Sequence, residues 1–246
     1  METQDIVALF NRLMGNALIT LSIGLSEAER ASHAIFRAYA EKYGLAFEII
    51  SEPAFRIRPN WFRKRRVWCQ IEKFQLHDAL GRYERVLFLD SDILLGPDCP
   101  DLFTLVPDGL LGCAYDDEGA DAWKREAELR KLEKRLGTLV EGPWRYFNSG
   151  VMVLDASHRP LFEMDRKAFI RGRWPEQTLL NYRVLKRGIR IHKLDPPYNF
   201  FPTGRNDWQE DAKRLSAPVI HYAGQGSKPV MAADLPRIRQ AWGLDT

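Results

Sequence analysis

A short segment about a third of the way along the chain, residues 86–89, is apolar at every position. Such continuous apolar patterning is typical of a strand that is buried on both faces of an α/β sheet. Closer to the N-terminus, an apolar run at 17–25, a helix-forming stretch that stops at Gly44 and a second apolar run at 46–50 predict a βαβ unit. The strands of that unit are parallel and its crossover is right-handed. We therefore expect an α/β fold built on parallel strands.

The rest of the chain continues this alternation of helix-forming and apolar segments. With 246 residues, the chain can bury a sizeable core without disulfides. The sequence shows no internal repeat, low-complexity tract or clear linker, which favours a single domain over residues 1–246. Helices are expected at 26–43, 68–81, 121–136, 159–171 and 175–188, and further strands at 110–115, 147–154, 189–194 and 218–222.

Composition narrows the classes of protein. A formal net charge of +3 is too small to indicate nucleic-acid binding. Cys69, Cys99 and Cys113 form no close pair and no metal-ligand spacing, so reduced thiols and a cytoplasmic location are expected. The N-terminus lacks a signal-peptide pattern, and the run at 17–25 is shorter than the roughly 20 residues that cross a bilayer. We expect a protein that is soluble or peripheral to the inner face of a membrane.

Two carboxylates follow the central apolar strand directly. Asp90 and Asp92 stand one residue apart, at the strand end where ligands collect in open α/β sheets. Burying both unpaired would be costly, and a divalent cation bound to substrate phosphates would remove that cost. The alternative is a pair of solvated turn carboxylates, because Asp-x-Asp alone is a short motif.

Four motifs in order resemble one known family. They are Phe-Leu-Asp-Ser-Asp-Ile-Leu-Leu at 88–95, Phe-Asn-Ser-Gly-Val at 147–151, Trp-Pro-Glu-Gln-Thr-Leu-Leu-Asn at 174–181 and His-Tyr-Ala-Gly-Gln-Gly-Ser-Lys-Pro at 221–229. Together they resemble the retaining glycosyltransferases of the glycogenin and lipopolysaccharide-galactosyltransferase type. The resemblance implies the GT-A fold, a Rossmann-like single domain with a mixed, mostly parallel sheet flanked by helices. It also implies a nucleotide-binding half at about 17–115 and a sugar- and acceptor-binding half at about 116–246.

The resemblance implies a metal site. Asp90, Asp92 and His221 match the family's metal ligands, and Ser91 matches a residue that approaches the donor ribose. An imidazole beside two carboxylates suits Mn²⁺ better than Mg²⁺, although Mg²⁺ stays possible. UDP-sugar is the donor that the family implies. The loop after the first strand, 22–26, lacks the family's Asp and Tyr that help to bind uracil.

The segment after His221 matches the family's diphosphate-binding loop. Gly224 and Gly226 would let the backbone approach phosphate, and Lys228 would supply charge to the leaving diphosphate. This sequence departs from the family in having three residues between Gly224 and Lys228, where two are usual, and Val230 in place of an aromatic residue.

Four further residues match positions that face the donor sugar. Asn148 and Gly150 belong to the Asn-Ser-Gly turn. Glu176 and Gln177 match an acidic-Gln pair, of which the acidic residue binds sugar hydroxyls and the glutamine lies near the anomeric carbon. Lys73 matches a basic residue that contacts the sugar and the carboxylates. More ordinary readings are a turn asparagine, a capped helix start and a solvated helix lysine.

The reaction that the resemblance implies is metal-dependent transfer of a hexose to a hydroxyl of a glycan, glycolipid or other acceptor, with retention. No strong nucleophile is evident, so we expect front-face attack by the acceptor hydroxyl, with Gln177 as a weak stabiliser. One alternative is a haloacid-dehalogenase-like phosphatase with Asp90 as nucleophile and Asp92 as acid/base. Another is a non-catalytic sugar-nucleotide-binding relative.

Two basic segments fall outside these motifs. Residues 56–66 mix arginines with aromatic residues, and 121–136 form a charged helix. They predict either an anionic acceptor, contact with anionic lipid headgroups, or a solvated loop and helix. The helix at 121–136 is also a candidate for a lid or an acceptor platform.

Overall fold

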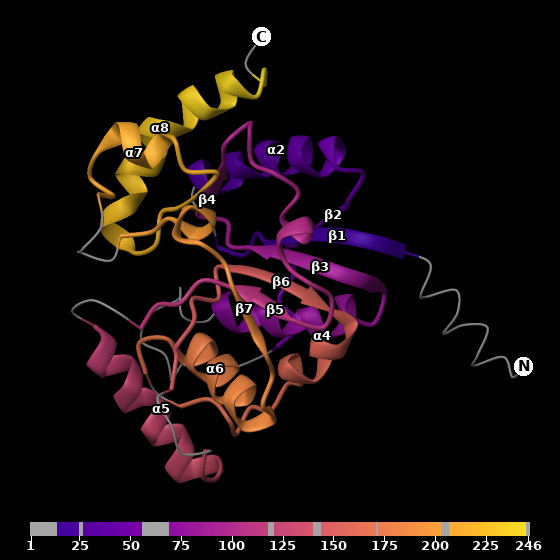
Figure 1. Cartoon of the computed structure of the whole chain (residues 1–246), viewed down its shortest axis with the longest axis vertical. Coiled ribbons are helices and arrows are strands. Elements are labelled where there is room, and N and C mark those ends of the chain that lie inside the picture. The colour runs from indigo at the N-terminus through magenta and orange to yellow at the C-terminus, as the bar shows by residue number, and fades with distance from the viewer. Residues whose placement is uncertain are drawn as a thin grey trace, which may run out of the picture.

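The computed structural model describes residues 14–24, 27–55, 69–117, 121–139, 144–170, 172–202 and 207–244. Within them, six strands form the larger of two sheets (Figure 1), in the order β2 (Ala46–Ile50), β1 (Met14–Leu21), β3 (Tyr83–Leu89), β6 (Val151–Asp155), β5 (Leu111–Cys113) and β7 (Ile191–Lys193). Only β6 runs antiparallel to its neighbours among these six strands, so the sheet is mixed and mostly parallel, as expected. The smaller sheet pairs β4 (Ile93–Leu95) with β8 (Val219–His221) in antiparallel fashion.

Strand β3 is buried on both faces, which confirms the prediction from its apolar pattern. Val86 and Phe88 point into one hydrophobic cluster, and Leu87 and Leu89 point into a second cluster on the opposite face. All four side chains are fully buried. Because successive strand residues alternate between faces, the part of a strand that serves two cores has no polar position, and Glu84 and Arg85 of β3 lie before this part.

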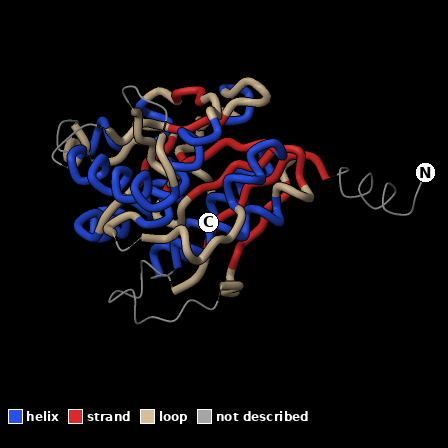
Figure 2. Tube along the Cα trace, turned by 90° about the horizontal axis from the view of Figure 1, so that it is seen from below, coloured by secondary structure: helices blue, strands red, loops and turns tan. Residues whose placement is uncertain are grey.

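Helices cover each face of the sheet. One face packs against α2 (Glu27–Lys42) and α8 (Lys228–Ala241), which lie above the sheet in Figure 1. The other face packs against α4 (Leu76–Ala79), α5 (Ala122–Leu136) and α6 (Pro175–Arg187). Figure 2, seen from below, shows this second group in front of the strands. The result is a single-domain, three-layer α/β arrangement.

Several helix ends follow the sequence signals. Gly44 has a positive φ of 64° after α2, and Gly188 closes α6 in the left-handed conformation with a φ of 61°. Glycine occupies such positions without the steric penalty that a Cβ brings. Residue 26, where the first helix is expected to begin, lies outside the described residues.

Two predicted helices differ from the structure. The helix expected at 68–81 is a 3₁₀ segment, η2 (Ile71–Gln75), followed by the short α4. The helix expected at 159–171 is wrong: a 3₁₀ segment, η4 (Ala156–Phe162), begins earlier, and residues 163–170 are not helical. Asp155 and His158 form a capping box that fixes this earlier start. Phe169 and Ile170 gave an apolar pattern because they fill the core.

Strand ends also shift. The first strand runs over 14–21 rather than 17–25, and the strand expected at 147–154 begins only at Val151. Phe147 makes a single bridge to Tyr115 before the Asn-Ser-Gly turn. Short elements that the sequence did not predict are η3 (Leu102–Leu105), η5 (Pro196–Asn199), α7 (Asp211–Leu215) and η6 (Gln225–Ser227). No helix in the described ranges is long and apolar enough to cross a membrane.

Candidate active site

The candidate site lies where the large sheet meets the small one. Asp90 follows the end of β3, and its backbone N–H donates to the carbonyl of Gly150 at 2.8 Å. Three residues later β4 begins, and its first residue, Ile93, pairs with His221 of β8. This pairing brings Asp90, Asp92 and His221 together, with one ligand atom of each within 4.8 Å of the others. Two aspartates and a histidine that are far apart in sequence thus form one potential metal-binding cluster.

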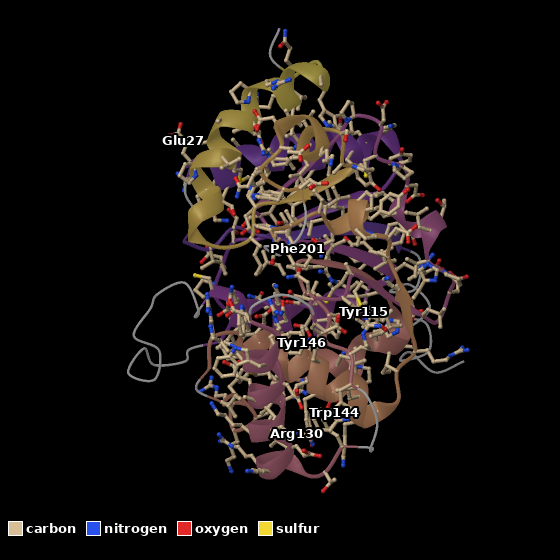
Figure 3. All side chains as sticks on the ribbon, turned by 60° about the vertical axis from the view of Figure 1, so that its left-hand side comes forward. Glu27, Tyr115, Arg130, Trp144, Tyr146 and Phe201 are labelled. Atoms are coloured by element: carbon tan, nitrogen blue, oxygen red, sulfur yellow. The ribbon has the colours of Figure 1, made fainter. Side chains whose placement is uncertain are left out.

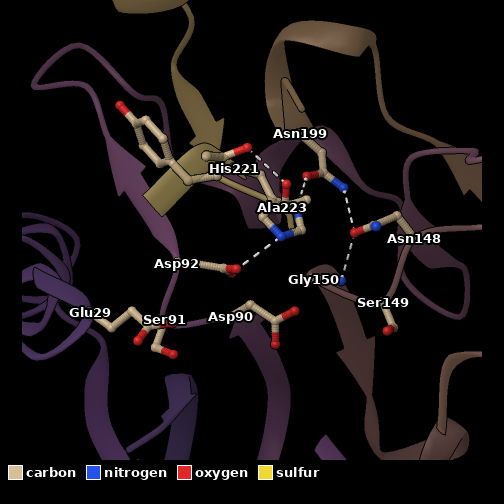
Figure 4. A network of polar contacts seen from close by, with 12 residues as sticks. Glu29, Asp90, Ser91, Asp92, Asn148, Ser149, Gly150, Asn199, His221 and Ala223 are labelled. Atoms are coloured by element: carbon tan, nitrogen blue, oxygen red, sulfur yellow. Dashed lines mark hydrogen bonds and ion pairs between the residues drawn. The ribbon is translucent and has the colours of Figure 1, made fainter. Parts of the chain in front are cut away.

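The orientation of His221 is set by a chain of amide hydrogen bonds (Figure 4). The Gly150 N–H and Asn199 Nδ2 both donate to Asn148 Oδ1, at 2.9 and 3.2 Å. Asn199 Oδ1 is then left to accept from His221 Nδ1 at 2.9 Å. In the neutral imidazole, Nε2 therefore carries the lone pair and faces Asp92 Oδ1 at 3.3 Å. This tautomer is the one in which Nε2 can bind a cation.

The two carboxylates experience opposite electrostatic environments. Burial raises the pKa of Asp90 despite the opposing charge of Lys73. Burial acts in the same direction on Asp92, but the charge of Lys228, and that of His221 when its imidazole is protonated, hold its pKa below the ordinary value. Lys228 Nζ bonds Asp92 Oδ2 and lies 3.3 Å from Glu29 Oε1. A protein ammonium group thus neutralises Asp92 on the side of the cluster that faces α8.

Lys73 is a buried lysine that contacts several polar groups of the site, rather than a solvated helix lysine. Its side chain is only 2% exposed, and Nζ lies 3.0 Å from Asp90 Oδ1 and 2.8 Å from Glu176 Oε1. It also donates to Ser149 Oγ at 3.1 Å. Burial alone would lower the pKa of Lys73, but Asp90 and Glu176 outweigh it and raise the pKa. The charge of this lysine ties Asp90 of the Asp90–Asp92–His221 cluster to the first turn of α6.

Glu176 and Gln177 stand in the first turn of α6, behind Pro175 at the start of the helix. Ser149 Oγ donates to Glu176 Oε1 at 2.6 Å, and the Ser149 backbone N–H donates to Gln177 Oε1 at 3.0 Å. The amide nitrogen of Gln177 is buried and has no hydrogen-bond partner of good geometry among the described residues, although the Gln177 side chain lies near enough to Asp116 to lower the pKa of that carboxyl. Because an orphaned buried donor is costly, it is suited to a substrate oxygen.

Gly150 makes room for His221. A Cβ at position 150 would lie 2.3 Å from His221 Cε1 and 2.9 Å from Asn148 Oδ1. The Asn-Ser-Gly turn therefore needs glycine for packing, in addition to any role toward a sugar.

Replacing this glycine should destabilise the protein. Gly150→Ala forces His221 out of position, and we expect a loss of about 1–3 kcal/mol in the free energy of unfolding, typical of overpacking. Urea denaturation measures this loss in the free energy of unfolding. Gly15→Ala is the matched control, because its Cβ would meet no atom within 4 Å. Equal effects of the two substitutions would contradict this packing role.

The remaining predicted residues lie around the cluster. Ser91 is buried, and its carbonyl accepts from Ser32 Oγ at 3.1 Å. Gly224 has a positive φ of 86° in the loop after β8, and Gly226 stands in η6, where a Cβ would meet nothing within 4 Å. Both glycines are exposed between His221 and Lys228. The structure brings Lys228 into the cluster and leaves the two glycines at its rim.

Asp116 is a site residue that the sequence reasoning missed. It follows the strand expected at 110–115, so the rule applied to Asp90 would have found it. Asp116 is buried and pairs with Arg125 of α5 at 2.7 Å. Burial raises the pKa of Asp116 to about 6, against the opposing charge of Arg125.

This raised pKa predicts a dependence of stability on pH. The folded state holds the Asp116 proton more tightly than the unfolded state does, so the contribution is present at low pH and lost as the pH rises through about 6. A shift of roughly two units corresponds to about 3 kcal/mol between about pH 4 and pH 7. The difference in unfolding free energy between wild type and Asp116→Asn should change by this order over that range. A difference that stays constant with pH would contradict the shift.

Comparisons with solved structures define the class of fold. The chain is similar to a glycosyltransferase involved in glycosylation of the major capsid of PBCV-1, at 15% identity over 90% of this chain and 100% of that chain, with a TM-score of 0.58. It is also similar to the galactosyltransferase LgtC in complex with donor and acceptor sugar analogs, at 16% identity over 95% and 97% of the two chains, with a TM-score of 0.57. These likenesses confirm the GT-A fold. No curated protein sequence matches the chain significantly.

A match of the sequence to a family model identifies the family of this chain. The family model for glycosyl transferase family 8 matches residues 34–229. The chain belongs to this family and is a glycosyltransferase. The predicted resemblance is thereby confirmed, and the phosphatase alternative is not retained.

Proposed function

We propose that this enzyme transfers a hexose from a UDP-sugar to an acceptor hydroxyl, with retention, and that it depends on a divalent cation. The observation that carries this proposal is the Asp90–Asp92–His221 cluster with the His221 tautomer set by Asn199. UDP as the nucleotide rests on family resemblance alone. The two structural relatives lend support to sugar transfer through their fold.

The residues present fit a divalent cation. Two carboxylates and one neutral imidazole are a mixed oxygen and nitrogen donor set, which suits Mn²⁺ and also permits Mg²⁺. Asp90, Asp92 and His221 would hold the ion, which would neutralise charge on the departing diphosphate. Lys228 already stands at Asp92, so its ammonium group can turn to phosphate oxygens once a cation neutralises that carboxylate.

The residues that we propose to face the donor sugar are held in place by contacts with one another. Lys73 holds Glu176 and Asp90 in place, and Ser149 fixes the oxygen of Gln177. The free amide N–H of Gln177 can donate to a sugar or phosphate oxygen that gains charge as the anomeric bond breaks. Glu176 is engaged by Lys73 and Ser149, which disfavours it as a nucleophile. This arrangement supports front-face attack by the acceptor hydroxyl.

Release of UDP tests the proposal. We expect the enzyme with Mn²⁺ to release UDP from at least one of UDP-glucose, UDP-galactose and UDP-N-acetylglucosamine, and to stop when the metal is chelated. NMR of the freshly formed product should show the anomeric configuration of the donor. Inverted product would overturn retention, and release that persists with chelator would overturn metal dependence.

Removing Asn199 should weaken metal binding without touching a ligand. Outer partners of metal-bound histidines typically contribute about 10–100-fold in affinity. We expect Asn199→Ala to raise the Mn²⁺ concentration for half-maximal activity by that factor. Gln240→Ala is the control, since this amide is exposed on α8. An unchanged Mn²⁺ requirement would show that Asn199 does not set the His221 tautomer.

The predicted anionic acceptor and membrane contact stay predictions. Segment 56–66 lies outside the described residues. On α5, Lys124 pairs with Asp121, Arg125 with Asp116 and Arg130 with Glu133. These pairs reduce the basic character that the sequence of α5 suggested. A cytoplasmic location is also a prediction.

A further inference from the structure

A second hollow lies beside the candidate active site, between α5 and the segment 144–146. Its volume is about 380 Å³, within the roughly 300–1,000 Å³ that small-ligand sites occupy. We call it the Trp123–Trp144 groove. Figure 3 shows Tyr146, Trp144 and Arg130 following one another along α5. Its lining residues are Asp117, Ala122, Trp123, Arg125, Glu126, Leu129, Arg130, Trp144 and Tyr146.

The groove combines aromatic faces with polar groups. Trp123 is 67% exposed, the largest exposure of any large hydrophobic side chain in the described part of the chain. Arg130 packs over the Trp144 ring at 3.9 Å and is fixed by Glu133 at 3.1 Å, which holds the indole in place. Exposing an indole to water is unfavourable unless something covers it.

The charges of the groove are balanced. Arg125 is paired with Asp116, and Arg130 lies 3.7 Å from Glu126. The Asp117 carboxylate is paired with Arg145, whose guanidinium stacks on Tyr115 at 4.0 Å. The lining therefore offers both donors and acceptors without a surplus of either sign. A pyranose ring, with an apolar C–H face and a rim of hydroxyls, matches this surface better than a phosphate or a polyanion does.

The groove adjoins the donor end of the site. Arg125 lines the groove on one side and holds Asp116 on the other at 2.7 Å. Tyr146 also lines the groove, and its hydroxyl lies 2.9 Å from Thr178 Oγ1, next to Gln177. One layer of side chains thus separates the groove from the residues assigned to the transferred sugar.

We propose that the Trp123–Trp144 groove binds sugar rings of a neutral glycan acceptor and so holds the acceptor hydroxyl near the donor. The inference rests on the proposed transferase function and adds the acceptor class and its site. Trp123 is the residue on which binding depends most, since its side chain is largely exposed, with the Lys124 ammonium group 5.5 Å from the centre of its ring.

Ligand-detected NMR tests the proposal in the absence of donor. The probes are neutral gluco-, galacto-, xylo- and N-acetylglucosamine oligosaccharides of two to five units, titrated into the whole chain. We expect at least one series to bind the wild type. Trp123→Ala should weaken its binding about tenfold, as loss of an aromatic contact does. Trp123→Phe should keep affinity within about threefold by the same measure, and Lys131→Ala, an exposed α5 substitution, should have no effect.

The outcomes separate this proposal from the proposed function. No binding by any series, or binding indifferent to Trp123, would overturn the groove assignment even if Mn²⁺-dependent UDP binding is intact. Binding that is lost in Asp92→Asn would also overturn it, because the ligand would then lie at the donor site. Trp123-dependent binding by a protein that binds no nucleotide would keep the groove and reject the UDP-sugar function.

Discussion

Lys73→Met should lower the free energy of unfolding by about 3–5 kcal/mol, the usual cost of breaking a buried ion pair by removing one partner. The substitution leaves Asp90 and Glu176 near one another without their shared cation. For a chain of this size the melting temperature should fall by roughly 6–20 °C. Donor turnover should also be lost, because Lys73 holds both carboxylates in place. Chemical denaturation and a thermal scan measure the stability.

A double substitution separates charge from packing. Lys73→Met with Glu176→Gln removes one uncompensated carboxylate and should recover part of the lost stability. Lys131→Met, on the exposed side of α5, should leave stability unchanged within about 0.5 kcal/mol. If Lys73→Met were as stable as the wild type, the ion pairs of Lys73 would not be formed in solution.

Asp92→Asn should reduce donor turnover by about 10³-fold or more, because an uncharged amide is a poor cation ligand and diphosphate departure would lose electrostatic stabilisation. Its carboxylate contacts both His221 and Lys228, so no other side chain substitutes for it. The side chain is about one-fifth exposed, and the fold should be retained. Release of UDP under saturating Mn²⁺ measures the effect.

Asp78→Asn is the matched control for this loss. Asp78 is also an aspartate, but its side chain is 84% exposed and lies on α4, outside the cluster. Donor turnover by the Asp78→Asn variant should equal that of the wild type. Turnover within tenfold of the wild type for Asp92→Asn would reject Asp92 as a metal ligand.

The parts of the fold that could be predicted are those with local causes. The four-residue apolar run of β3 and the glycines after α2 and α6 act on their own segments, and the structure has these elements at the expected places. The prediction of a helix at 159–171 was wrong because its apolar pattern has a tertiary cause rather than a local one. Its apolar residues face the core from a non-helical segment, and the Asp155 capping box starts η4 earlier.

In the candidate site, too, the residues with a local sequence signal could be predicted and the others could not. Asp90 and Asp92 could be located because they end an apolar strand. Their meeting with His221 depends on the pairing of β4 with β8, two short strands of which only β8 carried a sequence signal. Asn199 had no signal at all, because its role comes from lying in η5 beside the imidazole. The Trp123–Trp144 groove joins two segments whose proximity only the tertiary structure provides.

The most direct measurement is a thermal-shift experiment on the wild type with UDP, GDP, CDP and dTDP, each with and without Mn²⁺. A ligand at about a hundred times its dissociation constant adds roughly 2.7 kcal/mol of stability, which is easily detected. We expect UDP to stabilise the protein, only when Mn²⁺ is present, and the effect to disappear in His221→Ala. Stabilisation by UDP without metal, or no response to any nucleotide with metal, would contradict a metal-dependent UDP-sugar transferase.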